Sequence, residues 1–396
     1  MYFSLHNILP AVWVCLGVSL AAIIYLLTVY RSFTRLQPSV KTNGTDRERG
    51  PEIADDALPP VSVIVYARDN AAELRETLNT VLTQNYPASR MEVVVVNDGS
   101  VDEVTDVVNF LSLNHRNIYI TFVPEEAHNL SRKKLAVSLG IKAAKNDVVV
   151  LTVAGAHPAS ADWLRVMAAP FTRGKQIVLG WGYIEGLKGL MRRFDEAVCG
   201  TIWLSSALRK RPYRGTGFNL AYTRSIFFEA KGFSRSLNLQ NGDDDIFINQ
   251  IADSDNCEVV LEPEALMSVN FQRPTAAYRD LRLCHCFTRR RLPSYGSLMA
   301  GSGTAAIWVW LAAVVTGVVF SLPNWFPSLL FAATIPLLWI PLTINWLRTG
   351  RTLGITLSPA LLWWQMLWRW IPALKYRLNC GGSDRRNFTW HAKKLK

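Results

Sequence analysis

The sequence predicts an α/β domain with a mostly parallel central sheet, attached to a membrane by transmembrane helices. Two β-branched runs, 61–65 and 93–96, flank a segment with apolar residues at helical spacing. Strands that are joined by a helix in this way lie parallel. Residues 8–29 contain no charged side chain, and this length is enough to cross a hydrocarbon core of about 30 Å.

The N-terminal part of the chain is predicted to form a membrane anchor followed by a linker. Residues 1–30 are expected to form the transmembrane anchor. A cleaved signal peptide is the alternative, but the apolar stretch is long and has no clear small-residue cleavage site. Residues 31–58 mix Pro, Gly, Asp and Arg, a composition typical of a linker.

The C-terminal part carries further hydrophobic segments. Residues 304–347 contain two uncharged spans separated by a short turn, which predicts two transmembrane helices. Residues 353–374 are rich in Trp and include Arg369, so we expect an interfacial or membrane-associated helix there. A basic cytosolic tail at 375–396 completes the chain.

The charge distribution predicts the orientation. Lys and Arg follow the first span, precede the second and follow the third, so the positive-inside rule places the large domain in the cytosol. The protein is therefore expected to be a multi-pass protein of the inner (cell) membrane with lipids as partners. Membrane-facing cations account for much of the net charge of +12. No basic patch interleaved with aromatic residues stands out, so nucleic acid is not an expected partner.

Within the central domain, at 59–292, the pattern alternates between helices and strands as in other α/β folds. After the first two strands we expect, in order, a helix at 102–113, a strand at 118–123, a helix at 130–144, a strand at 148–152, a helix near 162–171, a strand at 176–182 and a helix at 193–209.

Asp98 is the first candidate binding residue. It leaves the second strand at the edge of the sheet where ligands of parallel sheets bind, and Gly99 permits a sharp turn. A carboxylate there can accept hydrogen bonds from a ribose or a base. Alternatively, this segment only caps the next helix.

These residues resemble the opening of a family 2 glycosyltransferase domain of GT-A fold, of the membrane-anchored bacterial type. The resemblance rests on the runs VSVIV and VVVNDGS, continues through Arg132-Lys133-Lys134 and the segment 215–252, and covers 59–292. It implies a nucleotide-sugar pocket lined by Ala67 and Asp98.

The resemblance also implies a divalent cation, Mg²⁺ or Mn²⁺, held by an Asp-x-Asp motif. This chain keeps the frame at 151–158 but has Val153 and Gly155 at the two acidic positions, so no metal ligands are expected and the cofactor is left open. His157 could supply a ligand instead, but a single imidazole is a poor ligand for a hard cation. Lys133, Lys134 or Arg289 could balance the diphosphate instead.

A second motif is well kept. The run 215–222 resembles the strand that lines the acceptor side in the family, with Gly217 and Asn219 as binding residues. The run 241–247 contains three adjacent aspartates that resemble an acidic motif of the family. A transferase of the inverting type needs a carboxylate to deprotonate the acceptor, and Asp244 is the expected base, with Asp243 and Asp245 as neighbours. An acidic helix N-terminus is the alternative reading.

A third motif is partly kept. Phe287 stands where relatives have Gln, and Arg289 and Arg290 resemble the following arginines, which help to hold the leaving group or acceptor. Contact with lipid headgroups is the alternative for these juxtamembrane residues. The nearby run 284–286 (Cys-His-Cys) lacks the second ligand pair of a structural zinc site.

The resemblance therefore implies a membrane-bound inverting glycosyltransferase. It would move a sugar from a nucleotide sugar to a lipid-linked or cell-envelope glycan acceptor in polysaccharide biosynthesis. The loss of the Asp-x-Asp motif leaves a second hypothesis, in which a catalytically inactive homologue serves as a binding or scaffold subunit at the membrane.

Overall fold

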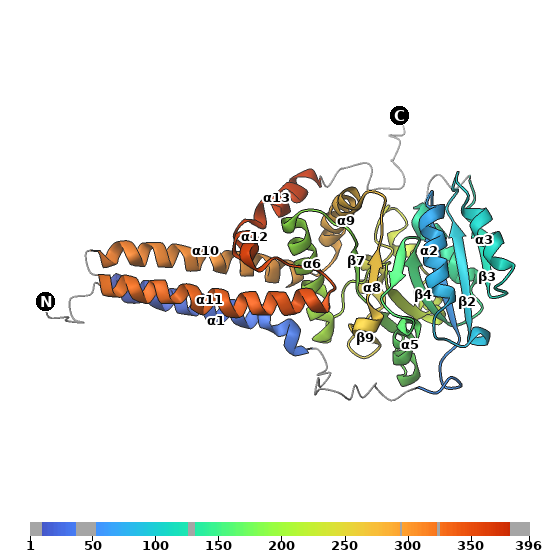
Figure 1. The fold of residues 1–396 in the computed structure, drawn as a ribbon, viewed down its shortest axis with the longest axis horizontal. Coiled ribbons are helices and arrows are strands. Elements are labelled where there is room, and N and C mark those ends of the chain that lie inside the picture. Colours follow the sequence, from blue (N-terminus) through green and yellow to red (C-terminus); the bar gives the residue numbers. More distant parts are fainter. Residues whose placement is uncertain (1–9, 37–52, 126–130, 294, 323–324, 381–396) are drawn as a thin grey trace.

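The computed structural model describes residues 10–36, 53–125, 131–293, 295–322 and 325–380. A central α/β domain lies at one end of three long helices (Figure 1).

A seven-stranded sheet in the order β3-β2-β1-β4-β8-β6-β9 forms the centre of the domain. Its strands are β1 (Val61–Ala67), β2 (Met91–Asn97), β3 (Ile118–Phe122), β4 (Val148–Val153), β6 (Ile177–Leu179), β8 (Leu220–Thr223) and β9 (Cys257–Val259). β1 pairs in parallel with β2 and β4, β2 with β3, and β6 with β9, whereas β8 runs antiparallel to β4 and β6. The expected mostly parallel sheet is therefore confirmed.

Helices cover both faces of this sheet. α2 (Ala71–Leu82), α3 (Val104–Ser112) and α5 (Trp163–Ala168) pack on one face, with Val63 and Val65 of β1. α4 (Arg132–Ala143) and α6 (Leu190–Leu208) pack on the other face, with Ile64. Side chains alternate along a strand, so one apolar run supplies both cores. This is why the strands read as continuous hydrophobic segments.

The predicted strand at 176–182 is wrong as a single element. The chain forms β6 in the main sheet and then β7 (Gly182–Ile184) in a second sheet of order β5-β10-β7. β5 is Ala156–Pro158 and β10 is Met267–Val269. Gly180 lies at the break, where a Cβ would stand 2.5 Å from Cγ of Asn219. Close packing at this position separates two strands that the apolar pattern joins.

The second half of the domain contains three further helices. They are α7 (Arg224–Glu229), α8 (Asp245–Ile251) and α9 (Pro274–Thr288). α9 leads through a turn at 289–291 towards the membrane-associated part of the chain.

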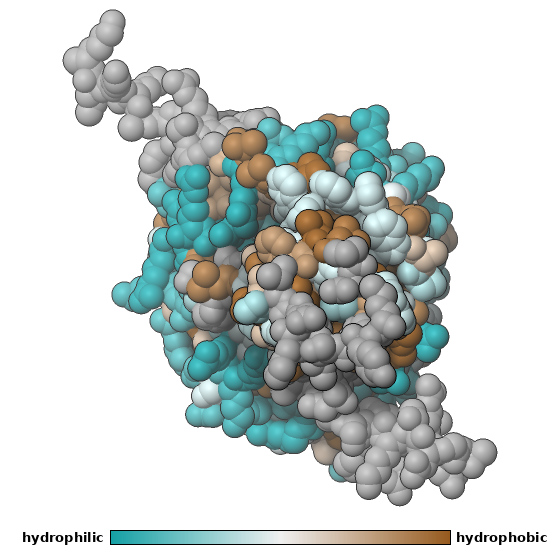
Figure 2. Space-filling model, turned by 90° about the vertical axis from the view of Figure 1, so that its left-hand side faces the viewer, coloured by the Kyte–Doolittle hydropathy of each residue, from teal (hydrophilic) through white to brown (hydrophobic). Residues whose placement is uncertain are grey.

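The three long helices lie side by side and project from the domain (Figure 1). They are α1 (Pro10–Leu36), α10 (Tyr295–Ser321) and α11 (Trp325–Thr352). Each contains a stretch long and apolar enough to cross a membrane: Pro10–Tyr30, Gly301–Ser321 and Trp325–Thr352. Viewed towards the end of the bundle, hydrophobic residues gather near the centre and hydrophilic residues surround them (Figure 2). α1 continues to Leu36, so a helix occupies the first residues of the expected linker.

The segment expected as one helix at 353–374 is divided. It contains α12 (Leu362–Trp368) and α13 (Trp370–Asn379), which lie where the bundle meets the domain (Figure 1). At about 1.5 Å per residue, neither helix is long enough to cross a bilayer. Most of the expected basic tail, 381–396, lies outside the described residues.

Candidate active site

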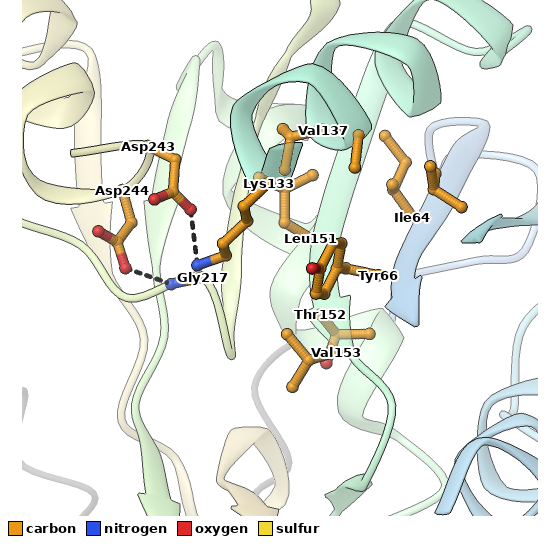
Figure 3. Close-up of a pocket in the computed structure, with 12 residues that line it drawn as sticks. Ile64, Tyr66, Lys133, Val137, Leu151, Thr152, Val153, Gly217, Asp243 and Asp244 are labelled. Carbon is orange, nitrogen blue, oxygen red and sulfur yellow. Dashed lines mark hydrogen bonds and ion pairs between the residues drawn. The ribbon is translucent and has the colours of Figure 1, made fainter. Parts of the chain in front are cut away.

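A pocket lies beyond the carboxyl ends of β1 and β4, between the start of α4 and the loops that precede β8 and α8 (Figure 3). Ligands of open α/β sheets bind at this edge. Its polar wall is formed by Tyr66, Lys133, Thr152, Gly217, Asp243 and Asp244, and its apolar wall by Ile64, Val96, Ala136, Val137, Leu151 and Val153.

Asp98 follows β2 at this edge, but protein groups already surround its carboxylate. The Tyr66 hydroxyl donates a hydrogen bond to Oδ2 at 2.7 Å, and Arg132 Nε donates to Oδ1 at 2.6 Å. Arg68 Nη1 lies 3.4 Å from Oδ2. The Asp98 side chain is 0% exposed, whereas Arg68 is 50% and Arg132 24% exposed. The two guanidinium groups are therefore more accessible from solvent than the carboxylate, and the expected direct contact of Asp98 with a nucleotide stays a prediction.

Ala67 is also fully buried, at the end of β1. Its carbonyl oxygen accepts a hydrogen bond from the Asp98 amide at 3.0 Å. Its side chain belongs to the core on the α2 face of the sheet. Ala67 thus positions Asp98 and presents no side chain to the pocket.

Lys133 supplies a positive charge inside the pocket. Its Nζ lies 2.7 Å from Oδ2 of Asp243, and its side chain is 36% exposed (Figure 3). Burial acts to lower the pKa of Lys133, but Asp243 and Asp244 outweigh it and the pKa is raised. Burial acts to raise the pKa of Asp243, and Lys133 holds it below the usual range. At neutral pH the two side chains form a charged pair.

Lys134 does not line the pocket, contrary to expectation. Its Nζ donates to the carbonyl oxygen of Ser236 at 2.6 Å and to that of Leu239 at 3.0 Å. Burial lowers its pKa to about 8. Consecutive helical residues point about 100° apart, so only one of the two lysines can face the site. Lys134 holds the segment before the three aspartates in place.

Asp244 has the electrostatic character of a base. Its Oδ2 accepts a hydrogen bond from the Gly217 amide at 3.1 Å (Figure 3). Its Oδ1 accepts a second hydrogen bond from the Asp245 amide at 2.8 Å. Burial, together with the neighbouring charge of Asp243, raises its pKa to about 6. A carboxylate of this pKa is ionised at neutral pH and accepts a proton more readily than an ordinary aspartate.

Asp245 points away from the pocket and has a structural position. Its buried carboxylate accepts hydrogen bonds from the hydroxyl of Thr288 on α9 and from Arg214 at 3.3 Å. It therefore ties the start of α8 to the end of α9. The predicted site contains two pocket-facing aspartates and one anchoring aspartate.

The residues at the end of β4 do not fit a divalent cation. Val153 lines the pocket, and Gly155 has φ of +90° with a Cβ position 2.3 Å from the carbonyl oxygen of Asn270. A side chain at 155 would overlap backbone. His157 lies 3.6 Å from Glu76. Within the described ranges no three His, Cys, Asp or Glu side chains gather into a set that could hold a metal.

Gly217 and Asn219, both predicted as binding residues, differ in position. Gly217 lines the pocket, where a Cβ would lie 3.6 Å from Lys133 Nζ. Asn219 is fully buried. It accepts from Trp163 Nε1 at 3.0 Å and donates to the carbonyl oxygens of Trp181 and Ala265. Asn219 joins the two sheets, so its predicted contact with substrate is wrong.

Arg289 and Arg290 are not among the pocket residues. They lie exposed in the turn after α9. Burial, followed by the nearby charge of Arg377, lowers the pKa of Arg289. Phe287 is buried, and Arg291 lies over its ring at 5.0 Å. The turn belongs to the region near α13, and its predicted role in binding stays untested.

Sequence reasoning missed Tyr66, Arg68 and Arg132 as partners of Asp98, and Thr288 and Arg214 as partners of Asp245. Arg132 stood in the quoted Arg-Lys-Lys run, which was the one available signal. The other contacts join residues far apart in the chain, and no local pattern reports them.

The comparisons with known proteins agree with this architecture. Residues 62–234 match the model of the family described as glycosyl transferase family 2. The chain is 29% identical over 184 residues to a probable glycosyltransferase, YdaM, of Bacillus subtilis, covering 44% of this chain and 43% of that protein. It is 31% identical over 80 residues to the glycosyltransferase AglE of Haloferax volcanii, covering 20% of this chain and 26% of that protein. The chain thus spans less than half the length of either curated relative.

Solved structures with a similar fold were also found. One is the mannosyltransferase PcManGT from Pyrobaculum calidifontis in complex with GDP-Man and Mn²⁺, with a TM-score of 0.47, 17% identity, and coverage of 92% of this chain and 99% of that chain. Another is S. aureus TarS 1-349 in complex with UDP-GlcNAc, with a TM-score of 0.40, 12% identity, and coverage of 80% and 89%.

The matched residues include β1, β2, α4, β4 and β8, the elements that carry most of the pocket. The family match and the curated relatives lead to one assignment. Residues 62–234 of this chain are similar to the domains of glycosyl transferase family 2.

Proposed function

We propose that the protein transfers a sugar from a nucleotide sugar to a hydroxyl acceptor at a membrane, with inversion at the anomeric carbon. The observation that supports this most is that the side chains of Lys133 and Asp244 both line the pocket. One side chain is cationic, and the other is a carboxylate whose pKa is raised to about 6.

On the donor side, the diphosphate needs positive charge near its oxygens as the bond to the sugar breaks. Arg68 and Arg132 lie at the edge where the nucleotide is expected, and Lys133 lies deeper in the pocket. Because Val153 and Gly155 provide no ligand, these three cations take the place of a metal in the proposed reaction. Lys133 exchanges its contact with Asp243 for the departing diphosphate.

On the acceptor side, Asp244 removes the proton from the acceptor hydroxyl. The acceptor oxygen then forms a bond to the anomeric carbon while the bond from that carbon to the diphosphate oxygen breaks, and the diphosphate leaves with the electron pair. Two backbone amides, those of Gly217 and Asp245, fix the orientation of the Asp244 carboxylate. A single displacement of this kind inverts the anomeric centre and needs one base.

The three apolar helices support the proposed membrane location. Their lengths and composition suit a bilayer, and the charge pattern supports a cytosolic domain in the inner membrane. The proposed acceptor is therefore a lipid-linked or envelope glycan.

The hypothesis of an inactive scaffold subunit rests on the same observation, namely that Val153 and Gly155 replace the two acidic residues of the Asp-x-Asp motif. It predicts nucleotide binding without turnover, or no binding. It gives no reason for a pocket carboxylate with a raised pKa beside a lysine, so we favour the enzyme.

The test is release of nucleoside diphosphate from a panel of UDP and GDP sugars by the full-length protein in lipid nanodiscs with membrane lipid extract and EDTA. We expect turnover that Asp244→Asn lowers by a factor of about 10²–10⁴, the usual contribution of a general base. Asp280→Asn is the matched control, because Asp280 is an exposed carboxylate on α9 that lies 3.1 Å from Arg279. Release that is unaffected by Asp244→Asn would refute the assigned base.

A further inference from the structure

A buried carboxylate between two guanidinium groups lies where α6, α9 and α12 meet. The side chain of Asp195 on α6 is 3% exposed. Arg282 Nε on α9 lies 2.8 Å from its Oδ2, and Arg369 Nε, directly after α12, lies 3.1 Å from its Oδ1. The hydroxyl of Tyr278 donates a further hydrogen bond to Oδ2 at 2.6 Å.

This cluster carries more positive than negative charge. The adjacent Glu196 accepts a hydrogen bond from the Ile184 amide at 2.9 Å, and burial raises its pKa to about 8. Glu196 is therefore mostly protonated at neutral pH, and two guanidinium groups share the single charge of Asp195. An unbalanced buried charge is costly, so the surroundings favour an added anion.

Gln365 provides a second, independent observation. It precedes Arg369 by four residues, so the two side chains lie on one side of the helix. Gln365 is 2% exposed, and among the described residues neither its amide nitrogen nor its carbonyl oxygen has a hydrogen-bond partner. Burying such an amide unpaired costs about 1–3 kcal/mol. An amide NH₂ group and a guanidinium on one side of a helix together form the type of donor set that binds phosphate oxygens.

The cluster is at the level where the bundle meets the domain (Figure 1). Trp308 of the α10 span donates through Nε1 to the carbonyl oxygen of Leu367 at 3.2 Å, which fixes α12 against that span. Trp363 and Trp364 of α12 are 46% and 48% exposed. Exposed Trp residues beside a span are typical of the lipid headgroup region.

We propose that Gln365, Arg369 and Arg282 bind the phosphate group of a membrane lipid. If the proposed glycosyl transfer holds, on which this step rests, that lipid is the carrier of the acceptor. Arg282 and Thr288 are six residues apart on α9, about 9 Å along the helix, and Thr288 contacts Asp245 beside the base. α9 therefore connects this cluster to the segment that carries Asp244.

The experiment is thermal unfolding of the full-length protein in detergent micelles that contain dioleoyl phosphatidic acid, with dioleoyl phosphatidylcholine as the neutral lipid and inorganic phosphate as a third arm. A ligand bound only by the folded state raises the midpoint. We expect phosphatidic acid to raise the midpoint by several degrees more than phosphatidylcholine. Gln365→Met should remove this difference while its own midpoint without added lipid stays equal or rises, because an unpaired buried amide is lost.

Arg351→Gln is the control, since Arg351 is an exposed arginine in the last turn of the α11 span, and it should keep the full shift. Arg369→Gln should lose the shift, at some cost in basal stability. An undiminished shift in Gln365→Met, or equal midpoints with the two lipids, would overturn the site. An equal shift with inorganic phosphate would overturn the lipid as its source. Because binding is the readout, a normal shift without sugar transfer would count against the proposed function alone.

Discussion

Asp98 and Asp244 lie at the same edge of the fold, and their surroundings give them different properties. Asp98 has a fully buried carboxylate contacted by Tyr66, Arg68 and Arg132. Asp244 is oriented by two backbone amides, and burial together with the neighbouring carboxylate of Asp243 raises its pKa to about 6.

The contrast separates two tasks. The Asp98 carboxylate is already occupied by protein donors, so Asp98 organises the two guanidinium groups at this edge of the sheet. A carboxylate beside a like charge retains affinity for a proton, which suits a base. The residue type is the same at the two positions, and neighbouring charge distinguishes them.

The largest effect is expected for Asp244→Asn. Turnover should fall by a factor of about 10²–10⁴. Because the folded-state pKa is raised, ionised Asp244 destabilises the fold above pH 6, and this penalty disappears as Asp244 becomes protonated below pH 6. The variant should therefore unfold at an equal or higher temperature than the wild type at pH 8, with a smaller difference at pH 5. A variant that loses activity through a lowered midpoint would contradict this account.

Lys133→Met should have the next largest effect. Loss of a charged contact to the diphosphate is expected to weaken nucleotide affinity by about 10–100-fold. Lys133 also lowers the pKa of Asp244, so the acid limb of the pH profile of turnover should move to higher pH. Isothermal titration and a pH series measure the two effects. Lys142→Met, at an exposed position in the last turn of the same helix, is the matched control.

Asp98→Asn should affect binding and leave the acid limb in place. Without the carboxylate, Arg68 and Arg132 lose their common partner, and we expect about a tenfold loss of nucleotide affinity, as for one charged interaction. The acid limb of turnover should stay near pH 6, because Asp244 is unchanged. A shifted acid limb would mean that the two carboxylates are coupled.

Gly217→Ala should give the smallest effect. The added methyl group would lie 3.6 Å from Lys133 Nζ and 3.8 Å from Asp244 Oδ2, which are ordinary contacts. The protein should fold normally and show a severalfold higher KM as the pocket narrows. Gly155→Ala should behave differently from Gly217→Ala. Its Cβ would lie 2.3 Å from the Asn270 carbonyl oxygen, so this variant should have a lower midpoint of thermal unfolding.

Local patterns predicted the strands β1, β2 and β4 well, because these strands are buried on both faces and appear in the sequence as apolar runs. They failed at 176–182, where packing of Gly180 against Asn219 sends consecutive residues into two sheets. They also could not separate Lys133 from Lys134. Only the position of α4 on the sheet decides that Lys133 faces the pocket, whereas Lys134 donates to the backbone carbonyl oxygens of Ser236 and Leu239.

The most direct test of the account is the affinity of UDP and GDP for the full-length protein, measured by isothermal titration in EDTA and again in Mn²⁺. Lys133 lines the pocket, and Arg68 and Arg132 lie at the same edge of the sheet, whereas Val153 and Gly155 offer no metal ligand. The account therefore predicts that one nucleotide binds with the same affinity in both solutions and more weakly to Lys133→Met. Binding that requires Mn²⁺, or that Lys133→Met leaves unchanged, would contradict the proposal that Lys133 stands in for the metal.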